Sequence, residues 1–585
     1  MLVLSRTVGT GAKDPTMSTR RTTASATTAT TASISAPLAR GRRRLALGGA
    51  VAASLLAAAC TGCTLPPPPG GGTPTTTSPG SGGPGGGGGT GTGSVAPYEI
   101  GSPVLTDVWL DPVHGDDAQS GNDRAHALRT MHAAWGRVPA DTAGAPTGTR
   151  IRITPGTVPV HSLPNNWYEA KRGTAAKPIV IAAADGRGTV TIEGGMNLYD
   201  VRYVYVLDLR MVAGGAAPAT TDLVLHVELG DHVLVRGNTF IGDRVETKET
   251  IKFNQSRFVY VEDNDISGAW DNPIDVVAVQ DGHLIRNKVH GGDDWCAYVK
   301  GGSARWVVDS NELYDCGVGG FTAGQGSGFE WMQAPWLHYE TYGIEVTNNV
   351  IHDTDGAGLG VNGGYNILMA HNTMYRVGAR SHVIEVVFGG RGCDGEAAMC
   401  ADHWRRGGWG PNGAGGEEYD IPNNHVAIVN NVVWNPAGFR SAWQHFAVAN
   451  PQSGRTSAHL PATVRADDDL RIAGNVIWNG PVDHPLGIDF DVTCRTTNIT
   501  CSEAQLRSQN AINTVEPRLV NPAGGDFRLT APVAGLTSAP IPAIVWTDAP
   551  TSPDLRGEAP VRTDAVTRTR SGGARPATGA RPGAL

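Results

Sequence analysis

Basic charge is scarce in the central part of this sequence. Residues 60–555 contain 33 Lys and Arg against 52 Asp and Glu, whereas residues 1–59 contain eight basic residues and one acidic residue. A body this acidic repels nucleic acids and anionic membrane surfaces, so we exclude nucleic acid as a partner. An anionic substrate would need a local basic patch or a bound cation.

Long hydrophobic runs are also missing. The apolar run at residues 45–59 has about fifteen residues, where a membrane-spanning helix needs about 20, and it suits the core of a signal peptide. Arg42, Arg43 and Arg44 before it resemble a twin-arginine signal, and residues 55–60 resemble a bacterial lipoprotein box that would lipidate Cys60. Cleavage by ordinary signal peptidase, which would release a soluble protein, is the alternative. We expect residues 1–60 to be a targeting segment of an extracytoplasmic protein that touches the membrane only through an N-terminal lipid anchor.

Two segments have compositions that cannot bury enough apolar surface to fold. Residues 61–100 are rich in Pro, Gly and Thr, and residues 556–585 are rich in Arg, Gly, Pro and Ala. We predict a disordered linker and a disordered basic tail, which leaves residues 104–555 as one folded domain.

A short pattern recurs through this domain: Asn, any residue, then an aliphatic residue or Phe. It begins at Asn238, Asn264, Asn287, Asn311, Asn349, Asn372, Asn431 and Asn475, with spacings of 26, 23, 24, 38, 23, 59 and 44 residues. Strand-like stretches flank each Asn, while helical periodicity and a leucine-rich frame are absent. The pattern predicts an all-β solenoid whose coils each add about 4.8 Å, with the Asn side chains hydrogen-bonded along its axis.

The segments that flank the repeats resemble those of a known superfamily. Residues 111–117, 120–122 and 128–135 resemble the opening segment of the pectate-lyase-like right-handed parallel β-helix superfamily, and residues 517–522 with 526–529 resemble its closing coil. The resemblance covers roughly residues 104–555 and implies a single right-handed parallel β-helix with an N-terminal capping helix. The superfamily includes lyases, hydrolases, epimerases and binding proteins, so the resemblance implies a fold more than an activity.

Two long steps between the Asn residues predict insertions at 317–342 and 389–424. Long insertions on a solenoid often form the walls of its binding groove. Aromatic faces stack on sugar rings, so we predict a substrate-binding set formed by Trp295, Trp331, Trp336, Tyr339 and Glu385. The alternative is that the aromatic residues only pack the insertion onto the solenoid.

Six of the eight cysteines pair by proximity, and export favours disulfides. The predicted bonds are Cys296–Cys316, Cys393–Cys400 and Cys494–Cys501. Metal binding is disfavoured because no CxxC motif or cluster of histidines accompanies them.

The Asn residues set the register of the neighbouring strands. Lys252, Asp275, Val299 and Gly360 each lie twelve residues before their Asn, so we expect them to stack on one face, with Lys252 above Asp275 as an outward ion pair. Lys300 falls in the inward register unless a one-residue bulge turns it out.

The polar residues of this region suit chemistry on a uronate. A uronate lyase must neutralise the sugar carboxylate, abstract the C5 proton and protonate the leaving oxygen. In β-helix lyases, Ca²⁺ on carboxylate oxygens often does the first task, and the base is Arg or Lys. The candidate Ca²⁺ ligands are Asp271, Asp275, Asp293 and Asp294. The candidate bases are Lys252, Lys300 and Arg391, with His382 or His352 as the acid. Alternatively, the acidic residues only form turns and pairs between coils.

These observations predict a monomeric enzyme that binds a polysaccharide and cleaves an acidic glycan by β-elimination. A glycoside hydrolase or epimerase using the same groove is the nearest alternative, with His382, Glu385 and Asp355 as its candidate residues. A non-catalytic surface protein that binds a glycan or a partner is the alternative from another class.

Overall fold

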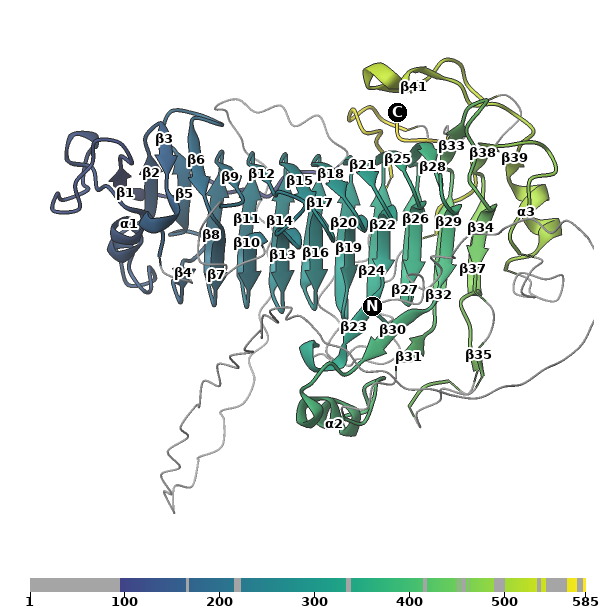
Figure 1. Ribbon diagram of the computed structural model, residues 1–585, viewed down its shortest axis with the longest axis horizontal. Helices are drawn as coiled ribbons and strands as arrows, with labels where there is room; N and C mark the ends of the chain where they lie inside the picture. The colour runs from purple at the N-terminus through teal and green to yellow at the C-terminus, as the bar shows by residue number, and fades with distance from the viewer. Residues whose placement is uncertain are drawn as a thin grey trace, which may run out of the picture. The chain divides into compact units, whose positions relative to one another are not determined.

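The computed structural model describes residues 95–164, 168–214, 223–332, 338–413, 418–449, 452–453, 459–461, 463–488, 500–533, 538–542, 566–575 and 582–585. Within these residues the chain passes repeatedly through three long sheets, here called A, B and C (Figure 1). Neighbouring strands of each sheet come from successive coils and pair in parallel. The predicted all-β parallel β-helix is confirmed.

The strands of the three sheets follow one another in chain order. Sheet A contains β1 (Leu105–Leu110), β2 (Gly148–Ile153), β5 (Ile179–Ala183), β8 (Arg202–Leu207), β11 (Asp231–Arg236), β14 (Arg257–Glu262), β17 (Gln280–Ile285), β20 (Ser303–Asp309), β24 (Thr341–Thr347), β27 (Gly364–Ala370), β32 (Asn424–Val429) and β37 (Asp468–Ala473). Sheet B contains β3 (Gly156–Val158), β6 (Val190–Glu193), β9 (Arg210–Val212), β12 (Thr239–Ile241), β15 (Asp265–Ala269), β18 (Lys288–Gly292), β21 (Glu312–Cys316), β25 (Val350–Thr354), β28 (Thr373–Val377), β33 (Val432–Asn435), β38 (Val476–Asn479) and β39 (Ala511–Ile512). Sheet C contains β4 (Tyr168–Glu169), β7 (Met196–Tyr199), β10 (Leu223–Glu228), β13 (Glu249–Asn254), β16 (Ile274–Val277), β19 (Trp295–Lys300), β22 (Gly319–Gly324), β26 (Ala357–Asn362), β29 (His382–Val387) and β34 (Gln444–Val448).

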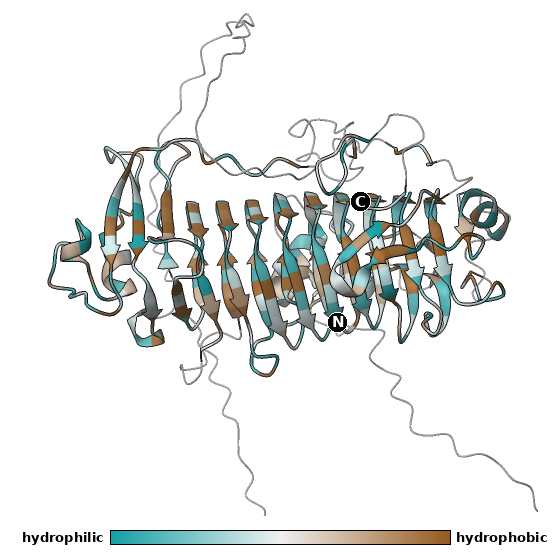
Figure 2. Cartoon of the chain, turned by 90° about the horizontal axis from the view of Figure 1, so that it is seen from above, coloured by the Kyte–Doolittle hydropathy of each residue, from teal (hydrophilic) through white to brown (hydrophobic). Residues whose placement is uncertain are grey.

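The core lies inside the coil, because side chains alternate between the two faces of each strand. The inward row of sheet C consists of Phe253, Val276, Val299, Ala323, Val361, Val386 and Val448, all of them buried. Figure 2 shows the resulting hydrophobic bands repeating from strand to strand. Burial of each Val or Phe side chain contributes about 1.5–3 kcal/mol, which favours one register for every coil. Val299 belongs to this row, so the prediction that it stacks with Lys252 is wrong.

The Asn residues of the repeat form a continuous ladder in the turn between sheets A and B. The backbone N–H of Asn349 donates to Oδ1 of Asn372 at 3.0 Å, and Nδ2 of Asn349 donates to the carbonyl of Val308 at 2.9 Å. The same pattern runs from Asn238 through Asn475 and ends on Asn510. The residue before each Asn turns the chain with a positive φ, for example 58° at Asn348. The predicted structural role of the repeated Asn residues is confirmed.

Short helical segments cover the ends of the solenoid. Helix α1 (Met131–Arg137) begins at Thr130, whose hydroxyl accepts a hydrogen bond from the N–H of Ala133, and it buries Trp135 with the first coils. This is the predicted capping helix. Other short elements are η1 (Arg124–His126), η2 (Val160–Ser162), α3 (Glu503–Gln509), η4 (Pro522–Gly524) and the antiparallel pairs β35 (Gln452–Ser453) with β36 (Thr463–Val464) and β40 (Leu519–Asn521) with β41 (Asp526–Leu529). In the described part of the chain, no helix has the length and apolar character needed to cross a membrane.

The two predicted insertions meet and form one lateral unit beside sheet C (Figure 1). Its three-stranded sheet joins β23 (Gly326–Gly328) from the first insertion to β30 (Gly389–Gly392) and β31 (Tyr419–Ile421) from the second. The 3-10 helix η3 (Phe329–Trp331) and α2 (Ala397–Arg405) pack around the Cys393–Cys400 disulfide. Both insertions therefore leave the coil at the predicted positions and pack together.

Two stretches of the C-terminal tail differ from the prediction of disorder. Residues 566–575 and 582–585 lie against the turns of the solenoid. Nη2 of Arg575 donates to Oδ1 of Asn348 at 2.8 Å, and the N–H of Ala584 donates to Oγ1 of Thr373 at 2.9 Å. The ladder turns thus provide hydrogen-bond partners that composition alone does not reveal.

Candidate functional site

A row of outward-facing side chains runs across sheet C. Its register positions are His226, Lys252, Asp275, Tyr298, Thr322, Gly360 and Glu385. Lys252 and Asp275 occupy the neighbouring positions that the Asn spacing predicted. Tyr298, rather than Val299, is the next residue of the row, and Lys300 follows it on the outside of the strand.

Lys252 is the centre of a buried charge cluster. Its Nζ lies 2.6 Å from Oδ2 of Asp275 and 3.2 Å from Oε1 of Glu249. Although burial opposes the charge, the two carboxylates raise the pKa of Lys252, and Lys252 in turn lowers the pKa of Asp275. A lysine held in its charged form cannot accept a proton at neutral pH. The geometry therefore contradicts Lys252 as a catalytic base.

Asp271 and Asp294 form a hydrogen-bonded carboxyl pair at the edge of the sheet. Asp271 precedes β16 and Asp294 precedes β19, so successive coils bring the two side chains together. Burial, followed by the negative charge of Asp294, raises the pKa of Asp271 to about 6. Burial also raises the pKa of Asp294, whose carboxylate accepts a hydrogen bond from the N–H of Trp295 at 2.9 Å. The pair can therefore hold a proton close to neutral pH.

Lys300 extends over the same cluster and is only partly buried. Its Nζ lies 4.1 Å from the ring centroid of Tyr298 and donates to Oε1 of Gln325 at 2.9 Å. Gln325 also hydrogen-bonds to Asp294, and the charge of Lys300 acts on both members of the carboxyl pair. Burial and the nearby carboxylates raise the pKa of Tyr298, so its phenol stays protonated. Lys300 is the predicted base that the structure places beside the acid pair.

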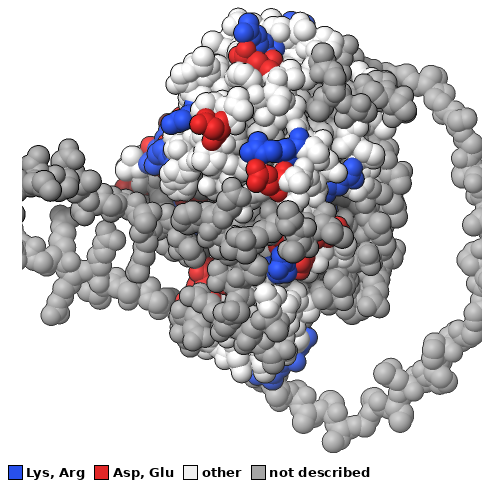
Figure 3. Space-filling model, turned by 90° about the vertical axis from the view of Figure 1, so that its right-hand side faces the viewer, with Lys and Arg blue, Asp and Glu red and all other residues white. Residues whose placement is uncertain are grey.

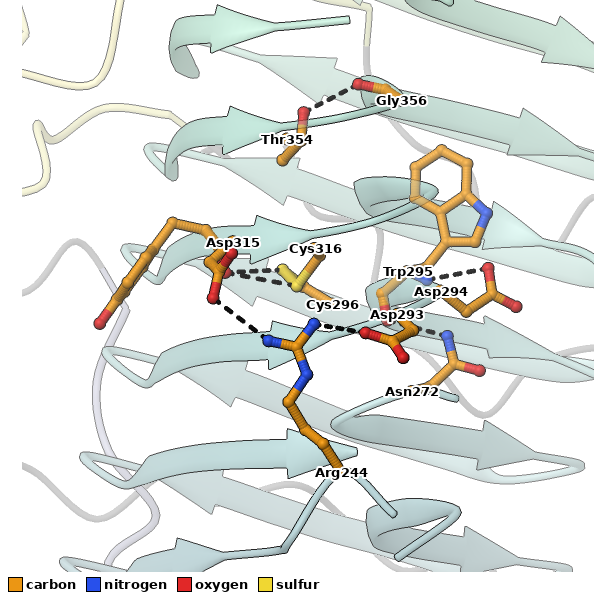
Figure 4. The surroundings of a disulfide bond; sticks show 11 residues. Arg244, Asn272, Asp293, Asp294, Trp295, Cys296, Asp315, Cys316, Thr354 and Gly356 are labelled. Carbon is orange, nitrogen blue, oxygen red and sulfur yellow. Dashed lines mark hydrogen bonds and ion pairs between the residues drawn. A yellow bond between two sulfur atoms is a disulfide. The ribbon is translucent and has the colours of Figure 1, made fainter. Parts of the chain in front are cut away.

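The four predicted Ca²⁺ ligands do not converge. Asp293 points away from Asp294 and forms an ion pair with Arg244, whose Nη1 lies 3.5 Å from Asp315 (Figure 4). Asp275 is engaged by Lys252, and Asp271 shares a hydrogen bond with Asp294. Ca²⁺ needs six to eight oxygen ligands. The Asp271–Asp294 pair shares a proton and lies near lysine side chains, so it does not offer such a ligand set. The predicted four-carboxylate site is therefore wrong, and we derive no step through a metal ion.

Arg391 is a structural residue of the lateral unit. Its guanidinium is fully buried, and Nε and Nη2 both donate to Oε1 of Glu340, at 3.0 and 2.5 Å. The carbonyls of His338, Tyr339 and Trp409 accept its other hydrogen bonds. Because no surface of Arg391 is exposed, the prediction that it acts as a base on substrate is contradicted. The Arg391–Glu340 pair instead fixes the second insertion to the first.

A second polar network lies further along sheet C. Oγ1 of Thr322 donates to Oδ1 of Asn362 at 2.6 Å, and Nδ2 of Asn362 donates to Oε1 of Glu385 at 3.1 Å. Oε2 of Glu385 lies 3.0 Å from Nε2 of His382. Three register steps, about 14 Å, separate Glu385 from Tyr298, so His382 does not reach the carboxyl pair. His352, the other acid candidate, lies on sheet B with Glu312 and Asp353.

The predicted aromatic contacts divide into buried and exposed residues. Trp295 and Tyr339 are buried and pack against other rings or strands. Glu385 is also buried, within its hydrogen-bond network. These three residues therefore present no free surface for binding. Trp331 is 52% exposed, and its carbonyl accepts a hydrogen bond from Gln255 at 3.0 Å. Trp336 lies outside the described residues.

Sequence reasoning missed two residues of the site. Trp270 is 44% exposed and directly precedes Asp271 in the chain. The sequence feature that could have identified Trp270 is its position next to the acidic turn at Asp271. Gln325 had no comparable signal, because only the packing of the insertion brings it to Lys300 and Asp294.

One disulfide lies beside the site and another lies in the lateral unit, so two of the three predicted bonds are confirmed. Cys296–Cys316 joins adjacent coils next to Asp294 and Trp295 (Figure 4), and Cys393–Cys400 lies in the lateral unit. Cys501 is disulfide-bonded, whereas its predicted partner Cys494 lies outside the described residues. Cys60, the predicted lipidation residue, also lies outside them.

The coil geometry defines a right-handed parallel β-helix protein with a polar outer face on sheet C, which is the fold that the predicted resemblance implied. Residues 224–393 match a family model described as "Right handed beta helix region". A search of curated protein sequences found no match.

Several solved structures share the fold at low sequence identity. Pectate lyase Pel9A is 14% identical, with a TM-score of 0.35, and the match covers 57% of this chain and 76% of that chain. The A-module of mannuronan C-5 epimerase AlgE6 from Azotobacter vinelandii is 13% identical, with a TM-score of 0.39 and coverage of 61% and 90%. XylC in complex with xylose is 9% identical, with a TM-score of 0.41 and coverage of 82% and 98%. These similarities concern the fold alone.

Proposed function

We propose that this protein is an extracytoplasmic polysaccharide lyase that cleaves a uronate-containing glycan by β-elimination. The observation that carries the proposal is the Asp271–Asp294 pair, a proton-holding acid at the edge of sheet C on which the charge of Lys300 acts. Trp270, the residue before Asp271 in the chain, offers a partly exposed ring for the apolar face of a sugar.

The three groups suit the successive tasks of the reaction. The protonated carboxyl pair donates a hydrogen bond to the uronate carboxylate, which makes the C5 proton more acidic. Nζ of Lys300 takes the C5 proton, and the released electron pair forms the C4–C5 double bond. The bond between C4 and the glycosidic oxygen breaks, and that oxygen takes up a proton from water. The products are an unsaturated uronate end and a new reducing end.

Hydrolysis by the same acid pair is less compatible with the geometry. Two-carboxylate glycosidases hold their carboxyl groups about 5–5.5 Å or 6.5–9.5 Å apart, whereas Asp271 and Asp294 are in hydrogen-bond contact. A purely binding surface would present stacked aromatic residues without titratable groups. Sheet C instead gathers Lys300, Tyr298 and the two aspartates within one cluster, which supports an enzyme.

The test is a panel of uronic-acid polysaccharides incubated with the purified protein, with and without chelator, and followed by the ultraviolet absorbance of the unsaturated product. We expect product on at least one polymer and the same rate with chelator. Folded protein that gives no unsaturated product on any polymer would overturn the proposal. Exchange of the C5 hydrogen with solvent deuterium without unsaturation would identify epimerisation in place of elimination.

A further inference from the structure

A separate cavity lies near the C-terminal end of the solenoid. Residues 435–440 line one side of it, and Trp478, Gly480 and Pro481 line the other. Its volume of about 430 Å³ falls within the range of about 300–1,000 Å³ that is typical of small-molecule sites. The charged cluster around Lys252 and Asp271 contributes no residue to this cavity.

The lining of the cavity combines aromatic surface with one cationic side chain. Phe439 and Trp478 supply the rings, and the guanidinium of Arg376 lies 5.0 Å from the Phe439 centroid. Arg440 forms no ion pair with any residue that the structure describes. A Cβ at Gly480, whose φ is 78°, would lie 3.2 Å from Cδ of Arg440, so the glycine leaves room for this side chain.

Several other arginines in the C-terminal part of the domain form ion pairs. Arg507, Arg518 and Arg528 are paired with Glu503, Glu516 and Asp526 at 3.0, 2.8 and 2.6 Å. Figure 3, which views this end of the molecule, shows several basic side chains next to acidic ones. A cavity that offers two aromatic rings and a guanidinium without an ion pair among the described residues suits a ring-shaped ligand that carries a carboxylate.

The cavity lies on the same edge of sheet C as the acid pair. Asp271 lies in the connection from β15 to β16, and residues 436–443 form the corresponding connection from β33 to β34. Five strand steps separate β16 from β34, which corresponds to about 24 Å along the axis. Trp443, 54% exposed, lies in the same connection as Arg440.

We propose that this cavity binds a uronate unit of the same polysaccharide chain whose reacting unit lies at Asp271 and Asp294. The inference rests on the proposed function and adds a distal binding site for long polymers. A chain that follows this edge of the solenoid places one sugar on the acid pair and a later sugar between Phe439 and Trp478, with its carboxylate on Arg440. Short oligosaccharides cannot reach both sites.

The test compares Arg440→Gln and Trp478→Ala with wild-type protein on a uronate polymer and on a trisaccharide of the same sugar. Loss of one charge-assisted hydrogen bond or one stacking contact predicts a KM for polymer about tenfold higher, with kcat unchanged. The KM for the trisaccharide should stay the same. Arg518→Gln, which removes an exposed arginine that is already paired, is the control. Equal effects on both substrates, or no effect on polymer, would overturn the inference.

A binding assay separates this inference from the proposed reaction. Titration of the uronate polymer into Lys300→Met protein measures binding without turnover, and Arg440→Gln in that background should weaken it about tenfold. If polymer binding depends on Arg440 while the wild-type protein gives no unsaturated product, the distal site is supported and the lyase is refuted. Polymer binding that is independent of Arg440 and Trp478 would refute the site.

Discussion

Lys252 and Asp275 form a nearly buried ion pair between adjacent coils, with 2.6 Å between Nζ and Oδ2 and only 2% of the Asp275 side chain exposed. Glu249 accepts a second hydrogen bond from the same ammonium at 3.2 Å. Lys252 thus bridges two carboxylates, of which Glu249 also pairs with Lys248 at 3.1 Å. Lys252 therefore contributes to stability, and Lys300 is the lysine that we propose as the base.

Replacement of Lys252 should therefore affect folding before it affects chemistry. Lys252→Met leaves buried Asp275 without its ion-pair partner and removes one of the two ammonium partners of Glu249. We expect a loss of about 3–5 kcal/mol in the free energy of unfolding. Lys248→Met removes a more exposed partner of Glu249 and should cost less than about 1 kcal/mol. Denaturant titration measures both. Equal stability of the two variants would contradict the assignment.

The Lys252–Asp275 contact was predictable because the ladder Asn fixes where each coil begins. The same reasoning failed for Val299 because Gly301 and Gly302, both with positive φ, lengthen the turn after β19 by one residue. Because of this extra residue, Tyr298 lies in the outward-facing row and the side chain of Lys300 also points outward. A count from Asn311 cannot show on which side of β19 the extra residue lies.

Residues in turns and insertions were less predictable than residues in strands. Asp293 and Asp294 are adjacent in sequence, yet one faces Arg244 and the other faces the site, because strand alternation does not apply in a turn. Arg391 was a candidate base in the sequence, but in the structure its guanidinium pairs with Glu340, which lies 51 residues away in the chain. Sequence therefore located the face of the site, whereas the roles of its charged residues depended on contacts between insertions and coils.

The pH dependence of turnover should report the proton on the carboxyl pair. Below pH 6, Asp271 is protonated. In this range kcat/KM rises with pH, because the neutral fraction of a lysine base increases about tenfold per pH unit while the lysine is mostly charged. Above pH 6, the loss of the Asp271 proton offsets this gain, so the profile of the wild-type protein should level off.

Asp271→Asn provides a neutral hydrogen-bond donor at every pH and should remove this levelling. We expect kcat/KM of this variant to keep rising above pH 6, whereas Asp293→Asn should retain the wild-type profile. Steady-state rates between pH 5 and 9 on a cleaved polymer make the comparison. A plateau from about pH 6 in Asp271→Asn would assign the titration to another group.

Lys300 should be required for proton abstraction and dispensable for folding. Lys300→Met removes the base, and we expect kcat to fall by about 10²–10⁴-fold while the midpoint of denaturation changes little. Lys288→Met is the matched control, because Lys288 also lies over a tyrosine, 5.3 Å from the Tyr314 centroid, but on sheet B. A comparable loss in both variants would indicate a general structural effect. Full activity of Lys300→Met would exclude it as the base.

The Cys296–Cys316 disulfide should support both stability and activity. It closes a loop between residues 20 apart and ties β19, which carries Tyr298 and Lys300, to the edge of sheet B. We expect the Cys296→Ser/Cys316→Ser variant to lose about 2–4 kcal/mol of stability and to show a lower kcat, because the strand below the acid pair is less constrained.

The Cys393→Ser/Cys400→Ser variant separates this effect from a general loss of stability. That disulfide lies in the lateral unit, away from β19, so its removal should lower stability with a smaller effect on kcat. Denaturant titration and product absorbance on the same samples measure both quantities. If the two double variants lost activity in proportion to stability alone, the Cys296–Cys316 bond would have no specific role in positioning the site. A kcat that falls only in the Cys296→Ser/Cys316→Ser variant would place the constraint at β19, where the acid pair and the proposed base meet.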